Sequence, residues 1–223
     1  MFSVMAAREQ AVKPGVLVSM GGHDLYEFPL MRAILPALLA GLMLVGSAGP
    51  ALADRFEAEV LSEINQARAN PSRYARELLR TKVSYGERGH DDPAALADAV
   101  EFLMRQPRLA ALTHNPRLAA AAADHVESQG PRGKVGHGRS GAFGKRLQAN
   151  GVYAGLAAEA ISYGQPTARD VVRQLVVDAG VPNRGHRRDI FGRNYQAAGV
   201  ACGPHAKWEK MCVIEFAGAI MKD

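Results

Sequence analysis

The sequence lacks the short motifs by which metal enzymes and nucleic-acid-binding domains are usually found. It contains no HExxH or CxxC motif, and no helix-turn-helix, zinc-finger or RNA-binding signature. Its formal charge is +5, but the positive residues are scattered. We therefore expect no nucleic-acid partner, and only weak attraction to anionic surfaces such as envelope polymers or lipid headgroups. The nearest approaches to a basic patch are Arg187-Arg188 and the series Arg73, Arg76 and Arg80.

Internal repeats, low-complexity tracts and a linker between two domains are also missing. Apolar residues make up 48% of the 223 positions, which is enough to build one hydrophobic core. A chain of this length usually forms one domain, and we expect one here.

The apolar run at 33–45 falls short of the roughly 20 residues that a membrane-spanning helix needs. A basic residue precedes it, and Ala-Leu-Ala at 51–53 has the A-x-A form of a cleavage site. This pattern predicts that residues 31–53 are a signal peptide. Residues 1–30 would then be a misassigned or dispensable extension. The mature chain would begin at Asp54, without a lipoprotein anchor because no cysteine follows the site. An uncleaved membrane anchor is the alternative.

Cysteine is scarce, with only Cys202 and Cys212 in the chain. Both lie beyond the predicted cleavage site, so an exported protein keeps them. An even pair of cysteines in an exported protein predicts a disulfide bond. The bond would join two C-terminal strands, and its presence agrees with a secreted protein in the periplasm or outside the cell.

Apolar periodicity and capping signals predict alternating helices and strands. Residues 56–69 place apolar side chains at three- and four-residue steps, which indicates an amphipathic helix. Asn or Asp followed by proline begins further helices at Pro71, Pro93 and Pro116, and a capping box begins another at Thr167. We expect strands at 157–163, 198–202 and 212–219, a short helix at 143–149, and polar loops at 81–91 and 129–142.

Two histidines and two carboxylates lie in local contexts that could converge in the fold. His137 lies in a glycine-rich loop, Glu159 near the start of a predicted strand, Asp178 at a helix end, and His186 beyond Pro182. Neutral imidazoles and carboxylates suit a divalent metal ion of the zinc class. Spacing alone does not join these residues, so surface or packing histidines are the alternative.

The other histidines and one serine are expected to have no part in such a site. His125 lies within an alanine-rich helix, where a packing role is expected. His90, His114 and His205 lie in predicted loops and should be solvated. Ser140 lacks the strand-turn-helix context of a hydrolase nucleophile.

The sequence segments around these residues resemble, in their order, those of the CAP superfamily of cysteine-rich secretory, antigen 5 and pathogenesis-related proteins. They are NQARANP, LTHNPRLAAAA, GHG, AEAISYG, VVRQL, GHRRDIF, AAGVACG and CVIEFAG. The segments are similar to those of bacterial members and make 56–219 a CAP/SCP-like domain. The resemblance implies an α+β fold, a three-layer α/β/α sandwich with a small antiparallel sheet.

The resemblance also implies a cavity that carries a tetrad of side chains. Matched to this sequence, the tetrad is His137, Glu159, Asp178 and His186, with the two histidines as ligands of a divalent metal, zinc preferred. No catalytic residue follows from the resemblance, and Glu159 is the one candidate.

Because CAP proteins share no common enzymatic activity, the resemblance implies a secreted binding module. Its partner would be a small apolar ligand, a lipid, a peptide or a cell-envelope component, and no membrane span would remain after cleavage. The alternative is a metal-dependent hydrolase, peptidase- or esterase-like, with zinc on His137 and His186 and Glu159 as general base. A third alternative is a cell-surface interaction protein in which the tetrad is only a polar brace.

Overall fold

The computed structural model describes residues 49–81 and 92–221. The chain divides into two units, Met1–Val45 and Gly46–Asp223, and the first lies outside the described residues, as does most of the predicted loop at 81–91. The boundaries predicted at 1–30 and 31–53 therefore stay predictions. No helix in the described part is both long and apolar enough to cross a membrane.

The helices predicted from the sequence begin within one residue of their expected starts, with one exception. Asn115 Oδ1 accepts hydrogen bonds from the first backbone N–H groups of α4, and Thr167 Oγ1 accepts one from Asp170 N at 3.1 Å. The exception is α1, which begins at Gly49 and so runs through the predicted cleavage site at 51–53. The bounds are α1 Gly49–Ala69, α2 Pro71–Arg80, α3 Pro93–Arg105, α4 Pro116–Gln129, α5 Ala142–Ala149, α6 Ala168–Val177 and α7 Gly185–Ile190, with 3-10 turns η2 Gly130–Arg132 and η3 Pro182–Arg184.

The described strands form one four-stranded sheet in the order β1-β3-β4-β2. The three long strands pair antiparallel, whereas the short β1 pairs parallel with β3 and makes the sheet mixed. The predicted strand at 157–163 is confirmed. The C-terminal hairpin is longer at its turn than predicted, so His205 belongs to a strand. The bounds are β1 Thr113–His114, β2 Ala157–Tyr163, β3 Ala197–His205 and β4 Glu209–Ala217.

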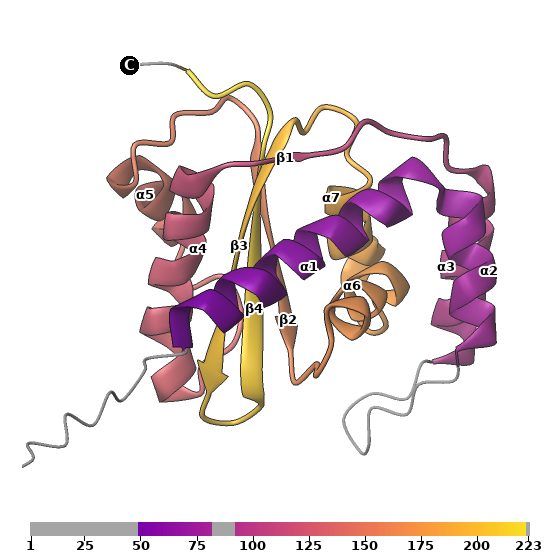
Figure 1. Cartoon of the computed structure of the whole chain (residues 1–223), viewed down its shortest axis with the longest axis horizontal. Helices are drawn as coiled ribbons and strands as arrows, with labels where there is room; N and C mark the ends of the chain where they lie inside the picture. Colours follow the sequence, from indigo (N-terminus) through magenta and orange to yellow (C-terminus); the bar gives the residue numbers. More distant parts are fainter. Residues whose placement is uncertain (1–48, 82–91, 222–223) are drawn as a thin grey trace, which may run out of the picture. The chain divides into compact units, whose positions relative to one another are not determined.

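Helices cover both faces of the sheet, with α1 and α6 on one and α4 and α5 on the other (Figure 1). Alternate side chains of β4 therefore enter different cores. Ile214 and Phe216 pack with the α1 and α6 side chains, whereas Met211 and Val213 pack with those of α4. The predicted α+β fold in three layers is confirmed.

Helix α4 lies unusually close to the sheet at Gly199. A Cβ atom there would collide with the backbone of Leu118 and Ala119. Only glycine allows this approach, and the alanines of α4 continue it along the helix. Glu215, which is directly opposite Gly199 in the β3–β4 pairing, is fully buried.

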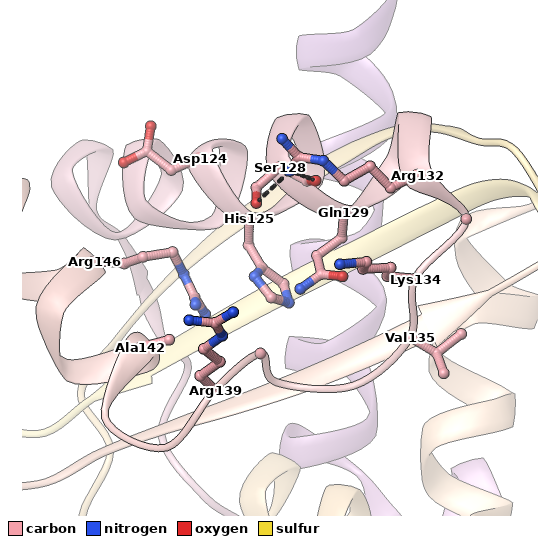
Figure 2. Close-up of a pocket in the computed structure, with 12 residues that line it drawn as sticks. Asp124, His125, Ser128, Gln129, Arg132, Lys134, Val135, Arg139, Ala142 and Arg146 are labelled. Atoms are coloured by element: carbon pink, nitrogen blue, oxygen red, sulfur yellow. Dashed lines mark hydrogen bonds between the residues drawn. The ribbon is translucent and has the colours of Figure 1, made fainter.

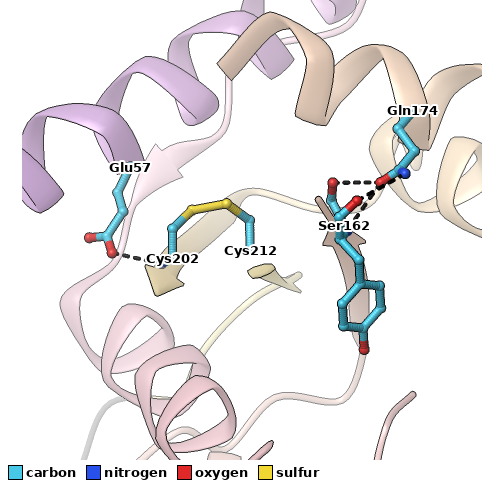
Figure 3. Close-up of a disulfide and its surroundings, with 6 residues drawn as sticks. Glu57, Ser162, Gln174, Cys202 and Cys212 are labelled. Carbon is cyan, nitrogen blue, oxygen red and sulfur yellow. Dashed lines mark hydrogen bonds between the residues drawn. A yellow bond between two sulfur atoms is a disulfide. The ribbon is translucent and has the colours of Figure 1, made fainter. Parts of the chain in front are cut away.

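The predicted disulfide between Cys202 and Cys212 is confirmed. The two residues are directly opposite in the β3–β4 pairing, on the side of the sheet that carries the α1 core. Cys202 N donates a hydrogen bond to Glu57 of α1 at 2.8 Å (Figure 3). The disulfide thus links β3 to β4 at the place where α1 contacts the hairpin.

Removing this disulfide should lower stability moderately. The loop that it closes is short, and we expect the Cys202→Ala/Cys212→Ala variant to lose about 2–3 kcal/mol of unfolding free energy. Urea denaturation with and without reductant measures the effect. Reductant should lower the stability of the wild type and leave the variant unchanged; equal stability of the two proteins without reductant would contradict the prediction.

Candidate functional site

The first half of the site is a hydrogen-bonded pair that joins the glycine-rich loop to the sheet. His137 Nδ1 donates a hydrogen bond to Glu159 Oε1 on β2 at 2.8 Å. The loop is held at Gly136, whose carbonyl accepts from His125 Nε2 and whose N–H donates to Tyr163 Oη, both at 2.9 Å. Gly136 has a positive φ of 87°, which other residues rarely adopt, so glycine is required where the loop turns toward the sheet.

The second half joins the end of α6 to the start of α7. His186 Nδ1 donates to Asp178 Oδ1 at 2.8 Å, and Asp178 Oδ2 accepts from Arg187 N at 3.2 Å. Asp178 is buried and has a left-handed φ of 55°, and Asn183 and Arg184 also have positive φ. Backbone in sparsely populated conformations clusters at functional sites because the surrounding fold must hold it there.

The structure brings these two pairs together. The imidazole rings of His137 and His186 lie 6.5 Å apart between centroids, with an angle of 45° between their planes. Helix α6 is tied to β2 because Gln174 Oε1 accepts hydrogen bonds from Ser162 Oγ at 2.6 Å and Tyr163 N at 3.2 Å (Figure 3). The tie fixes the end of α6 relative to the strand that carries the other carboxylate.

The donor set fits a metal ion bound by two histidines, and not one bound by all four residues. In the part of the chain that the structure describes, no group of three or more His, Cys, Asp or Glu side chains is placed to bind one metal ion. Both carboxylates instead accept the Nδ1 proton of a histidine, so each Nε2 keeps its lone pair. Histidine ligands of metals almost always donate their other ring N–H to a carboxylate, a backbone carbonyl or water. The hydrogen bond that His137 donates to Glu159 raises the pKa of His137.

Two residues that the sequence analysis missed complete the His137 side. Arg146 of α5 forms an ion pair with Glu159, and its guanidinium lies 3.6 Å from Glu215 of β4. Glu159 and Glu215 are directly opposite each other in the β2–β4 pairing. Glu215 is fully buried, and neither of its carboxyl oxygens has a hydrogen-bond partner among the described residues.

The two opposed carboxyls have pKa values shifted in opposite directions. Burial alone would raise the pKa of Glu159, but the hydrogen bond from His137 and the charge of Arg146 outweigh it and lower the pKa. Burial, together with the negative charge of Glu159, raises the pKa of Glu215 to about 9. At neutral pH the pair therefore holds one proton, on Glu215, as expected when like charges share a site.

Arg187 fixes α7 and hence the position of its neighbour His186. Its guanidinium donates to the carbonyls of Val176 at 2.6 Å and Val177 at 3.0 Å, and to Asp98 at 3.1 Å. The side chain is 2% exposed, and burial lowers its pKa. The Arg187-Arg188 pair is therefore no basic surface patch, because its first member is enclosed in the protein.

Two open cavities lie beside the tetrad and are lined by its neighbours. One, of about 730 Å³, lies beyond His137 and includes Gly138 and Arg146 (Figure 2). The other, of about 510 Å³, lies beyond His186 and includes Gly185 and Asp189. No residue of the tetrad is among those that line either cavity, so each cavity borders the site without including it.

A family model described as the cysteine-rich secretory protein family, CAP, matches residues 61–216 of this chain. The chain belongs to the CAP family. The predicted membership is thus confirmed, and the matched residues include all four members of the tetrad and the sheet up to Phe216.

Three solved bacterial structures are similar to this chain at low identity. An extracellular protein with an SCP domain from Bacillus anthracis is 18% identical, with a TM-score of 0.41, over 56% of this chain and 41% of that one. A cysteine-rich secretory protein from Staphylococcus aureus is 17% identical, with a TM-score of 0.39, over 57% and 39%. An outer surface protein from Borrelia burgdorferi is 15% identical, with a TM-score of 0.41, over 62% and 97%. This chain thus spans about two fifths of the first two proteins. No curated protein sequence matches it.

The other histidines of the CAP domain outside the tetrad differ in their surroundings. His125 is buried, as its predicted packing role requires, and burial lowers its pKa. His114 is exposed on β1, and His90 lies outside the described residues. His205 was predicted to be solvated, and this was wrong. It is 2% exposed, and its Nε2 donates to the Lys134 carbonyl at 2.8 Å, because the long hairpin folds back under the glycine-rich loop.

Of the residues that the sequence analysis missed, only Glu215 left a signal. It is the one charged residue in the apolar segment CVIEFAG of the CAP domain. Arg146 and Arg187 look like ordinary surface cations in the sequence, since nothing local shows which arginine of a helix turns inward.

Proposed function

We propose that this CAP domain is an exported binding module in which His137 and His186 hold a divalent metal ion, with zinc preferred. One observation carries the proposal. Each histidine donates its Nδ1 proton to a buried carboxylate, and the two rings lie 6.5 Å apart with their Nε2 atoms left as donors to an ion. Tetrahedral zinc would keep its remaining positions for water or a ligand.

Export is supported by the disulfide between Cys202 and Cys212, since such bonds persist mainly in oxidising compartments. The signal-peptide pattern at 31–53 agrees with it. We propose the periplasm or the cell exterior as the location. The ligand would be a small apolar molecule, a lipid, a peptide or a cell-envelope component.

The hydrolase alternative has less support from the geometry of the site. A general base works best when its pKa lies near the working pH. Glu159 has a lowered pKa, and both of its oxygens are engaged, one by His137 and the other by Arg146. Zinc-dependent turnover of peptide or ester libraries that is lost in Glu159→Gln would favour the hydrolase over the binding module.

Zinc should raise the stability of the folded protein through both histidines. A ligand that binds only the native state adds about 2.7 kcal/mol at a hundredfold excess over its Kd. We expect His137→Ala and His186→Ala each to remove most of this gain, measured as the zinc-dependent shift of the melting temperature. His114→Ala, which changes an exposed histidine, is the matched control and should keep the full shift.

Asp178→Asn should reduce the zinc-dependent shift less than either histidine variant, because Asp178 orients His186 and does not itself face the ion. If both histidine variants keep the wild-type shift, the metal site is refuted and the tetrad is a polar brace.

A further inference from the structure

The cavity beyond His137 is strongly basic, although nothing in the tetrad requires it to be. It lies between α4, the turn η2, the glycine-rich loop and α5. Arg132, Lys134, Arg139 and Arg146 line it, against one carboxylate, Asp124. Figure 2 shows Arg139 of the glycine-rich loop and Arg146 of α5 among the residues that line the cavity. We call these four cations and the space between them the basic pocket.

The positive charge of the basic pocket is only partly balanced within the protein. Arg146 is neutralised by Glu159 behind the pocket. The side chains of Lys134 and Arg139 form no hydrogen bond or ion pair with any described residue, and Arg132 donates only to the carbonyl and hydroxyl of Ser128. Arg132, Lys134 and Arg139 have no carboxylate partner among the described residues, so against Asp124 they leave two positive charges in one concave site. Cations gathered in this way repel one another and attract an anion.

The loop that carries Lys134 and Arg139 turns at glycines. Gly133, Gly138 and Gly141 all have positive φ, between 58° and 82°. Gly133 and Gly138 are lining residues of the basic pocket, so the loop turns around the pocket at positions that only glycine adopts readily. The guanidinium of Arg139 can bind two oxygens of a tetrahedral anion at once, and the ammonium of Lys134 adds a point charge.

We propose that the basic pocket binds a phosphate monoester, either as the headgroup of a lipid or as a soluble molecule. A phosphate monoester carries about −1.5 to −2 charges at pH 7, which matches the two unbalanced positive charges of the pocket. The volume of about 730 Å³ accepts the phosphate together with part of the group that it esterifies. The inference rests on the binding-module function and names the chemistry of its ligand, but it does not depend on the metal.

The test removes the two free cations while leaving the fold and the tetrad untouched. The Lys134→Gln/Arg139→Gln variant of the full chain is titrated calorimetrically with glycerol 3-phosphate. It is also mixed with phosphatidylcholine vesicles with and without phosphatidic acid. Each lost charged hydrogen bond should weaken binding about tenfold, so the pair should lose about a hundredfold. Lys145→Gln/Arg108→Gln removes the same charge from exposed positions outside the pocket and should bind like the wild type.

The two probes show whether the phosphate belongs to a soluble molecule or to a lipid headgroup, and the two double variants show whether the basic pocket binds it. Binding of glycerol 3-phosphate identifies a soluble ligand site, and binding of the phosphatidic acid vesicles alone identifies a lipid headgroup site. Equal losses in the two double variants, or no binding of either probe by the wild type, overturn the proposal. His186→Ala should keep phosphate binding while losing the zinc-dependent shift, so failure of the metal proposal is distinguishable from failure of this one.

Discussion

Replacing Glu215 by glutamine is expected to stabilise the folded domain by about 3 kcal/mol at pH 7. The folded protein keeps Glu215 protonated, because its pKa is raised to about 9, whereas the unfolded chain ionises it near its ordinary value of 4.5. Folding at pH 7 must therefore take up a proton, and this costs free energy. Glutamine has the same size and is neutral in both states, so the cost disappears.

The advantage of Glu215→Gln should depend on pH. Protonated Glu215 makes its full contribution to the free energy of unfolding of the wild type below about pH 4.5. This contribution is lost as the pH rises toward 9, because the pKa is higher in the folded than in the unfolded protein. Urea denaturation of both proteins should thus show little difference near pH 4.5 and a growing one up to pH 9. Glu127→Gln, at an exposed position of α4, serves as control and should track the wild type at every pH. A pH-independent difference would refute the assignment of the proton to Glu215.

The second large effect is expected at Arg187, in the opposite direction. Methionine has a similar length but cannot donate, so Arg187→Met leaves the buried carbonyls of Val176 and Val177 without their partner. Each buried acceptor left unsatisfied costs about 1–3 kcal/mol. We expect a loss of about 2–4 kcal/mol in unfolding free energy, measured by urea denaturation.

The neighbouring residue provides the control for Arg187. Arg188 lies on the same helix with its side chain exposed, and Arg188→Met should change stability by less than about 0.5 kcal/mol. Because Arg187 also positions His186, Arg187→Met should weaken zinc binding while Arg188→Met should not. Equal effects of the two substitutions on stability would show that the buried guanidinium contributes nothing.

Much of the fold could be predicted because its signals are local. The Asn-Pro and Asp-Pro steps placed the starts of α2, α3 and α4, since a cap and a first-turn proline act within one helical turn. Strand β2 came out at its predicted residues, where Ile161 and Tyr163 favour a strand and Gly164 follows its last residue. The parallel strand β1 was missed, since two exposed residues carry no pattern and become a strand only through β3.

The residues of the candidate site could be predicted from the sequence, but the hydrogen bonds between them could not. The segments GHG, AEAISYG and GHRRDIF identified the tetrad residues by resemblance. They gave no sign that each carboxylate would accept the Nδ1 proton of a histidine, which is what favours two metal ligands over four. Arg146, which neutralises Glu159 and lines the basic pocket, left no local signal at all.

The sequence by itself thus determined the helix starts, the disulfide and the family, because caps, periodicity and ordered segments are properties of neighbouring residues. Only the tertiary structure decided which charges are buried and which meet. Glu159 and Glu215 face each other because β2 and β4 pair in one register, and a slip by one residue would place them on opposite faces. His205 is buried because the hairpin meets a loop far from it in sequence. Burial and pairing of this kind depend on packing between distant segments, and they set the pKa values and the free charges from which the site is built.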